Sequence, residues 1–72
     1  MNQKEPITML ESDLMDWLPL DPKQAIPLHY LATVMNAKRI TIAFLLLSIQ
    51  AKGVPIAIQV TNDHYGFYIL TS

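Results

Sequence analysis

The spacing of the apolar residues changes at Gly53-Val54-Pro55, and this change constrains the fold more than any other feature of the sequence. Before it, apolar residues recur every three or four positions, which is typical of helices packed on one face. After it, Ile56, Ile58 and Val60 occupy every second position, which is typical of a half-buried strand. This order predicts an α+β domain in which helices come first and strands follow.

Three helices are expected before the change in spacing. Thr8-Met9-Leu10-Glu11 matches a capping box and predicts a helix that starts at Thr8 and is stopped by Pro19. Pro27 suits the first position of a second helix, which Asn36 would end in the left-handed conformation. A third helix is expected from about Arg39 to Lys52, ended by the glycine that follows it.

A β-hairpin is expected after the helices. Thr61-Asn62-Asp63-His64 supplies turn residues, and Gly66–Leu70 is rich in aromatic and β-branched residues, as a second strand requires. Two short helices joined by a tight turn and followed by two strands predict a three-helix winged helix-turn-helix domain, with the hairpin as its wing. This domain is expected to cover residues 7–71, after a flexible N-terminal segment at 1–6, with a connecting loop at Pro19–Gln24. The predicted core consists of Leu14, Trp17, Leu31, Ile42, Leu46, Ile49, Ile58 and Phe67.

The composition limits how such a domain is stabilised and where it works. The 72 residues include no cysteine, so neither a disulfide nor a thiolate metal site can supplement the core. Hydrophobic residues make up 51% of the chain and charged residues 15%, an apolar surplus that predicts a surface for a partner. The longest apolar stretch, Ile40–Ile49, is far shorter than the roughly 20 residues that cross a bilayer, and the N-terminus lacks the pattern of a secretory signal. We therefore expect a cytoplasmic protein that does not use a membrane.

Charge is divided unevenly along the chain. Residues 1–22 carry one lysine and five carboxylates, a net charge of −4, whereas residues 23–72 carry four basic residues and one carboxylate, a net charge of +3. So weak a basic balance would give little of the counterion-release affinity on which autonomous DNA binding depends. Glu11, Asp13 and Asp16 form an acidic cluster on the first helix, which is either a solvated face or a surface offered to a basic protein.

Residues that could carry catalysis or hold a metal are scarce. His29 and His64 are the only histidines, and neither has the carboxylate spacing of a metal site. The sequence has no nucleophile elbow and no glycine-rich phosphate loop, so we expect neither an enzyme nor a cofactor nor a small-molecule substrate. Together with Tyr65, His64 is instead a candidate for a secondary contact to a partner or to DNA, as are the three carboxylates of the acidic cluster.

The expected third helix has two apolar faces. At 100° per residue, one stripe forms a normal core face, and a second stripe at offsets of four, seven and eleven residues lies on the opposite side. The first stripe consists of Ile42, Leu45, Leu46 and Ile49. The second consists of Ile40, Phe44, Leu47 and Ala51. A winged helix that reads DNA would carry arginine, lysine, asparagine or glutamine on that outward face.

Three interpretations of the second stripe follow. Another segment could cover it, so that both faces belong to the core, because a helix that is apolar all round is usually buried. The stripe could instead be an exposed surface that binds a protein, or the helix could contact DNA. On the protein-binding interpretation, the contact residues are Lys38, Arg39, Ile40, Thr41, Phe44, Leu47 and Ser48.

Three segments carry a resemblance to a known family. The run Ala25–Leu31, the step Gly53-Val54-Pro55-Ile56 and the closing Tyr65–Leu70 resemble the small winged-helix proteins of Firmicutes phages, and the match covers most of the chain. In those relatives the third helix is studded with arginines, whereas this chain has Ile42–Leu47 there. In its size and its apolar helix, the chain is similar to the antirepressors of the modulator-of-repression type from lactococcal temperate phages.

The resemblance implies a lysis-lysogeny regulator in the cytoplasm of a host bacterium. Such antirepressors pair with the lysogeny repressor and keep it off DNA. The implied partner is therefore a phage repressor, contacted at its basic helix-turn-helix DNA-binding domain, with weak or no DNA binding by this chain alone. The alternative is a DNA-binding winged helix of excisionase or transcription-factor type.

Overall fold

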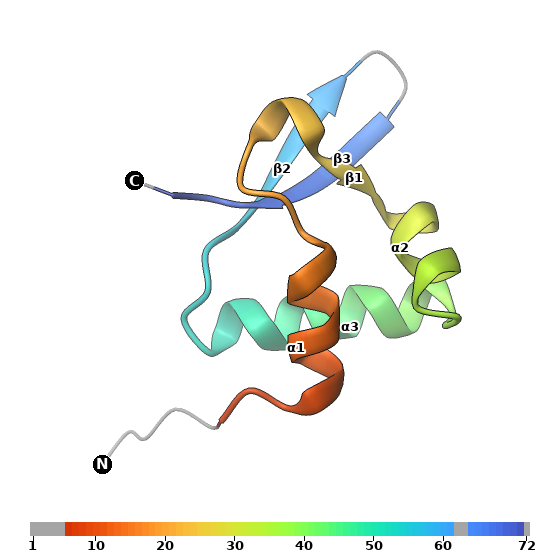
Figure 1. Cartoon of the computed structure of the whole chain (residues 1–72), viewed down its shortest axis with the longest axis vertical. Coiled ribbons are helices and arrows are strands. Elements are labelled where there is room, and N and C mark those ends of the chain that lie inside the picture. Colours follow the sequence, from red (N-terminus) through yellow and green to blue (C-terminus); the bar gives the residue numbers. More distant parts are fainter. Residues whose placement is uncertain (1–5, 62–63, 72) are drawn as a thin grey trace.

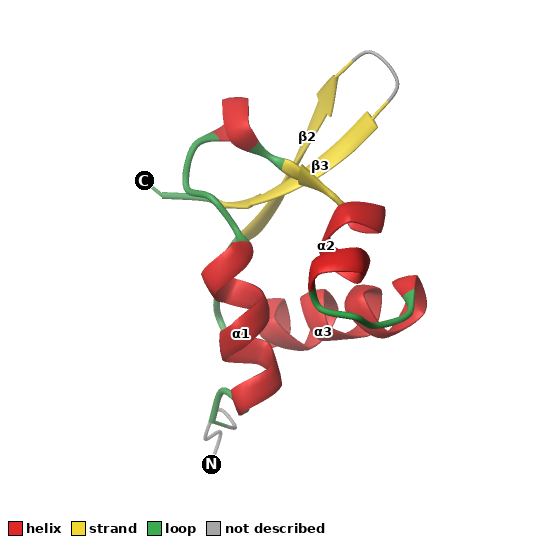
Figure 2. Cartoon of the chain, turned by 45° about the vertical axis from the view of Figure 1, so that its right-hand side comes forward, coloured by secondary structure: helices red, strands yellow, loops and turns green. Residues whose placement is uncertain are grey.

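The structure, a computed structural model, describes residues 6–61 and 64–71. Within these residues it contains three α-helices and a three-stranded antiparallel sheet (Figure 1), so the predicted α+β class is confirmed. The helices gather at one end of the molecule, and the two longer strands extend away from them (Figure 2). In chain order the elements are α1 (Met9–Trp17), the 3₁₀ helix η1 (Pro22–Gln24), β1 (Ile26–Pro27), α2 (Leu28–Val34), α3 (Arg39–Ala51), β2 (Ile56–Thr61) and β3 (His64–Ile69).

The signals at the helix ends act largely as the sequence predicts. The Thr8 hydroxyl accepts a hydrogen bond from the Glu11 amide at 3.1 Å, and the Glu11 carboxylate accepts one from the Thr8 amide at 2.9 Å, which completes the capping box. Asn36 follows α2 with a φ of 53°, and Gly53 follows α3 with a φ of 102°. Pro27 differs from the prediction, because its backbone is extended and it is the N-cap of α2 rather than the first helical residue.

Two predicted segments lie partly outside the described residues. Of the flexible segment expected at 1–6, residues 1–5 are not described, and neither are Asn62 and Asp63 of the hairpin turn. The connecting loop expected at Pro19–Gln24 contains one short regular element, η1, whose first turn is capped by the Asp21 side chain. The loop prediction therefore missed a turn of 3₁₀ helix, which is too short to show a period in the sequence.

The predicted two-stranded sheet is wrong in its number of strands. Residues Ile26–Pro27 form β1 and pair antiparallel with β3, with Ile26 opposite Phe67 and Pro27 opposite Gly66, which makes the sheet order β1-β3-β2. Two residues directly before a helix show no alternation of apolar and polar side chains, so the sequence contains no strand signal there. The chain can approach β3 this closely because Gly66 has no side chain.

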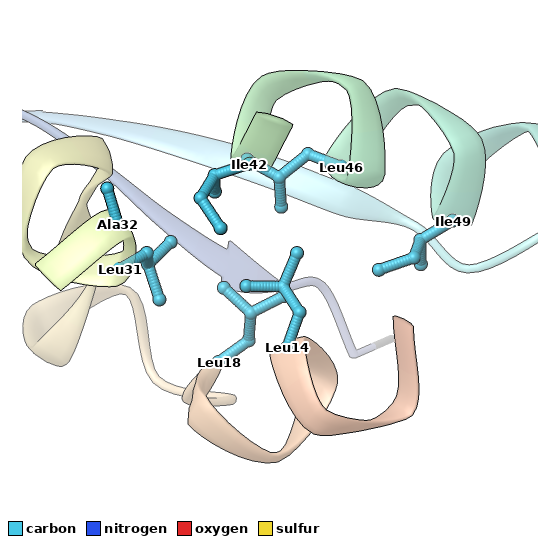
Figure 3. Close-up of a cluster of buried hydrophobic side chains, with 7 residues drawn as sticks. All are labelled: Leu14, Leu18, Leu31, Ala32, Ile42, Leu46 and Ile49. Atoms are coloured by element: carbon cyan, nitrogen blue, oxygen red, sulfur yellow. The ribbon is translucent and has the colours of Figure 1, made fainter. Parts of the chain in front are cut away.

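The core lies where the three helices meet. In Figure 3 the side chains of α1 point toward those of α3, and those of α2 close one end of the cluster. The sheet packs against this cluster through the half-buried Phe67 and Ile69, among others. The buried apolar residues are Leu14, Leu18, Leu31, Ala32, Ile42, Leu46 and Ile49.

Two residues of the predicted core are exposed. Trp17 is 43% exposed because it is the last residue of α1 and lies at the margin of its apolar stripe, whereas Leu14 and Leu18 are buried. Ile58 is 56% exposed because the hairpin of β2 and β3 extends beyond the helices that would cover it (Figure 1). Alternation along a strand predicts which face is apolar, but the reach of neighbouring helices decides how much of that face is covered.

One buried charge joins α1 to α3. Glu11 is only 2% exposed, and its carboxylate accepts hydrogen bonds from Lys52 Nζ at 2.6 Å and from the Ser48 hydroxyl. Lys52 also donates to the carbonyl oxygen of Pro6 at 3.0 Å. The hydrogen bond from Lys52, followed by those from Ser48 and Thr8, lowers the pKa of Glu11 from 4.5 to about 2. The carboxylate is therefore ionised at neutral pH, with its charge balanced inside the fold.

No single helix in the described part of the chain is long and apolar enough to cross a membrane. The helices α2 and α3 have sufficient length and apolar composition only when taken together, and the chain bends by 102° between them.

Replacing Gly66 by alanine should destabilise the fold by about 1–3 kcal/mol, the usual cost of forcing extra atoms into a packed site. A Cβ at this position would lie 2.7 Å from the Cβ of Ala25 and within 2.9 Å of its carbonyl group, so β1 would have to move away from β3. Urea denaturation measures the change in unfolding free energy. The matched control is Gly53→Asn, which introduces a residue that tolerates a positive φ. It should lower the unfolding free energy by less than Gly66→Ala does. A fully stable Gly66→Ala variant would contradict the close pairing of β1 with β3.

The Glu11 network should make the stability of the fold depend on pH. Because the folded pKa lies below the ordinary value, the ionised carboxylate stabilises the fold above pH 4.5, and this contribution is lost as the pH falls toward 2. Glu11→Gln should therefore lower the unfolding free energy at pH 7, and its difference from the parent should shrink on acidification. Asp13→Asn, which removes an exposed carboxylate of the same helix, is the control for the loss of a negative charge from α1. Equal pH profiles for the two variants would contradict the role of Glu11.

Candidate functional site

The strongest candidate site is the side of α3 that faces away from the core. Ile40, Phe44 and Leu47 are 62%, 64% and 62% exposed, and we call these three residues the outer face. The opposite side of the same helix buries Ile42 and Ile49 completely. In the described part of the chain, neither the hairpin nor the N-terminal segment covers the outer face, so the interpretation in which both stripes are core is wrong.

Neighbouring elements explain why only this side of α3 is open. At 100° per residue, Ser48 lies about 120° from Ile42, on the side that meets α1, where it donates to Glu11. Thr41 lies on the same side and is half-buried. The predicted contact surface therefore needs a correction, because Ser48 is bonded inside the fold and Thr41 lies apart from the outer face, whereas Lys38 and Arg39 at the start of α3 are exposed.

The outer face continues into a groove between α3 and the sheet. The deeper part has a volume of about 330 Å³ and contains Leu47 of the outer face together with Ile58 of β2. Its apolar walls are Leu28, Ala43, Leu46, Leu47, Ile56, Ile58 and Phe67, with Gln50 at the side. The adjoining part, of about 450 Å³, shares Leu28, Ile58 and Phe67 and is completed by Pro27, His29, Arg39 and Tyr65. We call the two parts together the sheet groove.

The charges around the sheet groove are basic. Arg39 lines its outer part, and Lys38 lies next to Arg39 in a neighbouring hollow that also includes His29. Among the described residues, no carboxylate lines either part of the groove. The site is thus an apolar strip with two cations at one end, which suits contact with a protein surface rather than a chain of phosphates.

A second candidate surface lies between α1 and α2. Asp13 and Asp16 are exposed beside Trp17 and Leu10, and with Val34 and Met35 they line a hollow of about 540 Å³, which we call the α1–α2 groove. Glu11 was predicted to belong to this acidic surface, but its burial against Lys52 removes it. Two carboxylates around an exposed tryptophan remain, and tryptophan is among the residues that most often dominate binding energy.

The remaining predicted residues contribute unequally. Tyr65 is 65% exposed and lines the sheet groove, whereas the side chain of His64 lies outside what the structure describes. Among the described residues there is no group of three or more histidines and carboxylates that could hold a metal ion. Every buried side-chain nitrogen and oxygen in the described part of the chain has a hydrogen-bond partner. The arrangement therefore offers surfaces for binding.

The contribution of the sheet to the site was missed by the sequence reasoning. Ile58 was assigned to the core, and the part played by Phe67 and Leu28 in a groove was not foreseen. The alternation of Ile56, Ile58 and Val60 was the signal that could have indicated this groove. A chain of 72 residues does not always have enough other elements to bury the apolar face of a strand.

The chain was compared with known protein families, sequences and structures. No protein-family model, no curated protein sequence and no solved structure matches the chain.

The two faces of α3 should respond differently to charge. Leu46→Asp should unfold the domain, because an unpaired carboxylate in the core costs several kcal/mol and a small domain has little stability to lose. Phe44→Asp should leave the thermal melt, followed by circular dichroism, nearly unchanged, because its side chain is solvated. The matched control Lys23→Asp lies on the exposed η1 and should also have little effect. If Phe44→Asp unfolds the domain as Leu46→Asp does, the outer face is part of the core.

Proposed function

We propose that this protein is a non-catalytic binding module of the winged helix-turn-helix type that acts as an antirepressor. In this role it binds the DNA-binding domain of a phage repressor through the outer face of α3 and prevents that domain from binding DNA. The single observation that carries the proposal is the exposure of Ile40, Phe44 and Leu47 on the helix that a winged-helix protein would insert into DNA.

The fold supports the winged-helix part of the proposal. The chain turns by 102° between α2 and α3 over a short connection, within the range of helix-turn-helix units. The β2–β3 hairpin follows α3 directly and extends beyond the helices, in the position that a wing would occupy (Figure 1). The third, short strand β1 leads into α2 and makes the sheet three-stranded without changing this order.

The chemistry of α3 supports a protein partner over DNA. A helix that reads bases presents donors and acceptors to the groove, whereas this helix presents two aliphatic side chains and a phenyl ring. Lys38 and Arg39 at its start provide too few phosphate contacts for tight binding at physiological salt. The same three side chains are suited to the apolar centre of a protein interface, where a few large residues contribute most of the affinity.

The resemblance to phage antirepressors adds the identity of the partner to the proposal. A repressor's helix-turn-helix domain is basic on its DNA-binding side, and the α1–α2 groove offers Asp13 and Asp16 beside Trp17 as a second contact for such a domain. The outer face of α3 and this acidic groove share no residue, so substitutions in each test the two contacts separately.

The test uses the helix-turn-helix domain of the lysogeny repressor from the genome that encodes this chain, titrated by calorimetry. We expect a complex that releases the repressor from its operator in a gel-shift assay. Phe44→Asp should weaken the complex by at least about 30-fold, since removal of a central apolar anchor typically costs about 2 kcal/mol and an added charge costs more. Lys23→Asp is the matched control and should bind as the parent does.

The alternative function, DNA binding of the excisionase or transcription-factor kind, predicts the opposite result. In that case the chain alone would bind duplex DNA selectively at sub-micromolar concentration and would lose affinity steeply as salt rises. We expect instead no better than the non-specific range of about 10⁻⁴ to 10⁻⁶ M. Selective sub-micromolar binding by the free chain would overturn the antirepressor proposal.

A further inference from the structure

The outer edge of β2 presents unpaired backbone groups. In an antiparallel ladder, alternate residues direct their N–H and C=O groups to the neighbouring strand, and the residues between them direct theirs outward. The Leu70 amide donates to the Pro55 carbonyl at 2.8 Å, which shows which residues of β2 face β3. By this alternation Ala57 and Gln59 bond to β3, and the backbone groups between them point to the open side of the sheet.

The outward residues of β2 are Ile56, Ile58 and Val60. A second hydrogen bond agrees with this assignment, because the amide of Ile69, the residue opposite Ile56, donates away from β2 to the Pro19 carbonyl at 2.9 Å. Since β2 is the last strand in the order β1-β3-β2, no strand in the described part of the chain pairs with these outward groups. The described structure thus leaves a row of backbone donors and acceptors at one edge.

The two edges of the sheet differ in how they are protected. The β1 edge is two residues long and contains Pro27, which has no amide hydrogen, and both features discourage pairing with another chain. The β2 edge is six residues long and contains no charged residue, no proline and no glycine. Natural proteins usually blunt such an edge with a lysine or a bulge, so an unprotected edge is typical of a strand that pairs with something.

We propose that β2 pairs antiparallel with β2 of a second copy of this chain, about a twofold axis at Ile58. In this register Ile58 lies opposite itself and Ile56 lies opposite Val60, so each outward amide faces an outward carbonyl of the other copy. A twofold interface must be complementary to itself, and an uncharged strand meets this condition because no like charges come together. The two three-stranded sheets then become one continuous sheet.

The side chains favour the same pairing. Ile56, Ile58 and Val60 project to one face of the sheet, where Ile58 and Val60 are exposed in the single chain. In the pair, each Ile58 contacts the other Ile58, and each Val60 contacts Ile56, so apolar surface is removed from water beside the new hydrogen bonds. The other face brings Ala57 near Gln59, a small residue and an uncharged one that meet without repulsion.

The first experiment measures association and its location together. Sedimentation velocity from low micromolar to millimolar concentration should show a reversible shift from monomer to dimer. Amide hydrogen exchange followed by NMR should show that the amides of Ile58 and Val60 become protected as the concentration rises, whereas those of Ala57 and Gln59 are protected throughout. A monomer at every concentration, or uniform protection without this alternation, would overturn the proposal.

Charge substitutions at the axis give a sharper test. Ile58→Lys and Ile58→Glu should each be a folded monomer, because two like charges would lie opposite each other, whereas an equal mixture of the two should form a heterodimer. Tyr65→Lys is the matched control, since Tyr65 is 65% exposed on the same sheet face but lies on β3, away from the edge. Dimer loss in Tyr65→Lys, or a mixture that stays monomeric, would show that β2 edges do not pair.

This inference does not rest on the proposed function. Phe44→Asp should weaken repressor binding by at least about 30-fold and leave self-association unchanged, whereas Ile58→Lys should abolish self-association. If the amides of Ile58 and Val60 become protected only when the repressor domain is added, the edge belongs to that partner and pairing between copies is wrong.

Discussion

The carboxylate of Glu11 is the contact on which the arrangement of the helices depends. It accepts a hydrogen bond from the Thr8 amide, which completes the capping box of α1. It also accepts hydrogen bonds from the Ser48 hydroxyl of α3 and from the ammonium group of Lys52, directly after α3. One side chain therefore caps the start of its own helix and attaches that helix to α3, through a residue 41 positions away in sequence. A buried carboxylate is costly without partners, and three hydrogen bonds, of which the one from Lys52 is also an ion pair, make the burial of this one tolerable. Because the attachment lies at the first turn of α1, the later turns are directed over the core.

The position of α1 decides which side of α3 remains open. Leu14 of α1 and Leu18, directly after it, cover the inner stripe of α3, and Phe67 and Ile69 of β3 pack against the same cluster from the sheet. A chain of 72 residues then has no further element in the described structure to place over the outer side. The exposed Phe44 is thus a consequence of domain size as well as of sequence, and it provides the apolar centre that the proposed function requires.

The surfaces that remain differ in chemistry. The outer face and the sheet groove are apolar with cations at one end, whereas the α1–α2 groove combines Trp17 with two carboxylates. The edge of β2 offers backbone groups instead of side chains. The α1–α2 groove shares no residue with the outer face, the sheet groove or β2, whereas Ile56 and Ile58 of β2 also line the sheet groove.

By itself, the sequence determined the features that depend on neighbouring residues. The capping box at Thr8, the positive φ of Asn36 and Gly53 and the core stripe of α3 were all predictable, because each follows from interactions within a few residues along the chain. The acidic charge of α1 and the second apolar stripe were visible as well, but their places inside or outside the fold were not.

Only the tertiary structure decided the features that depend on distant partners. The sequence placed Glu11 in an exposed acidic cluster, and only the fold brings Lys52 beside it and buries it. The sequence contains no strand signal at β1, and only the fold sets Ile26 opposite Phe67. Trp17 is exposed for the same reason, since only another element of the fold could have covered it. Burial and strand pairing depend on contacts between segments far apart in sequence. A local pattern shows which surface is apolar, but it does not show which segment or which other molecule covers that surface.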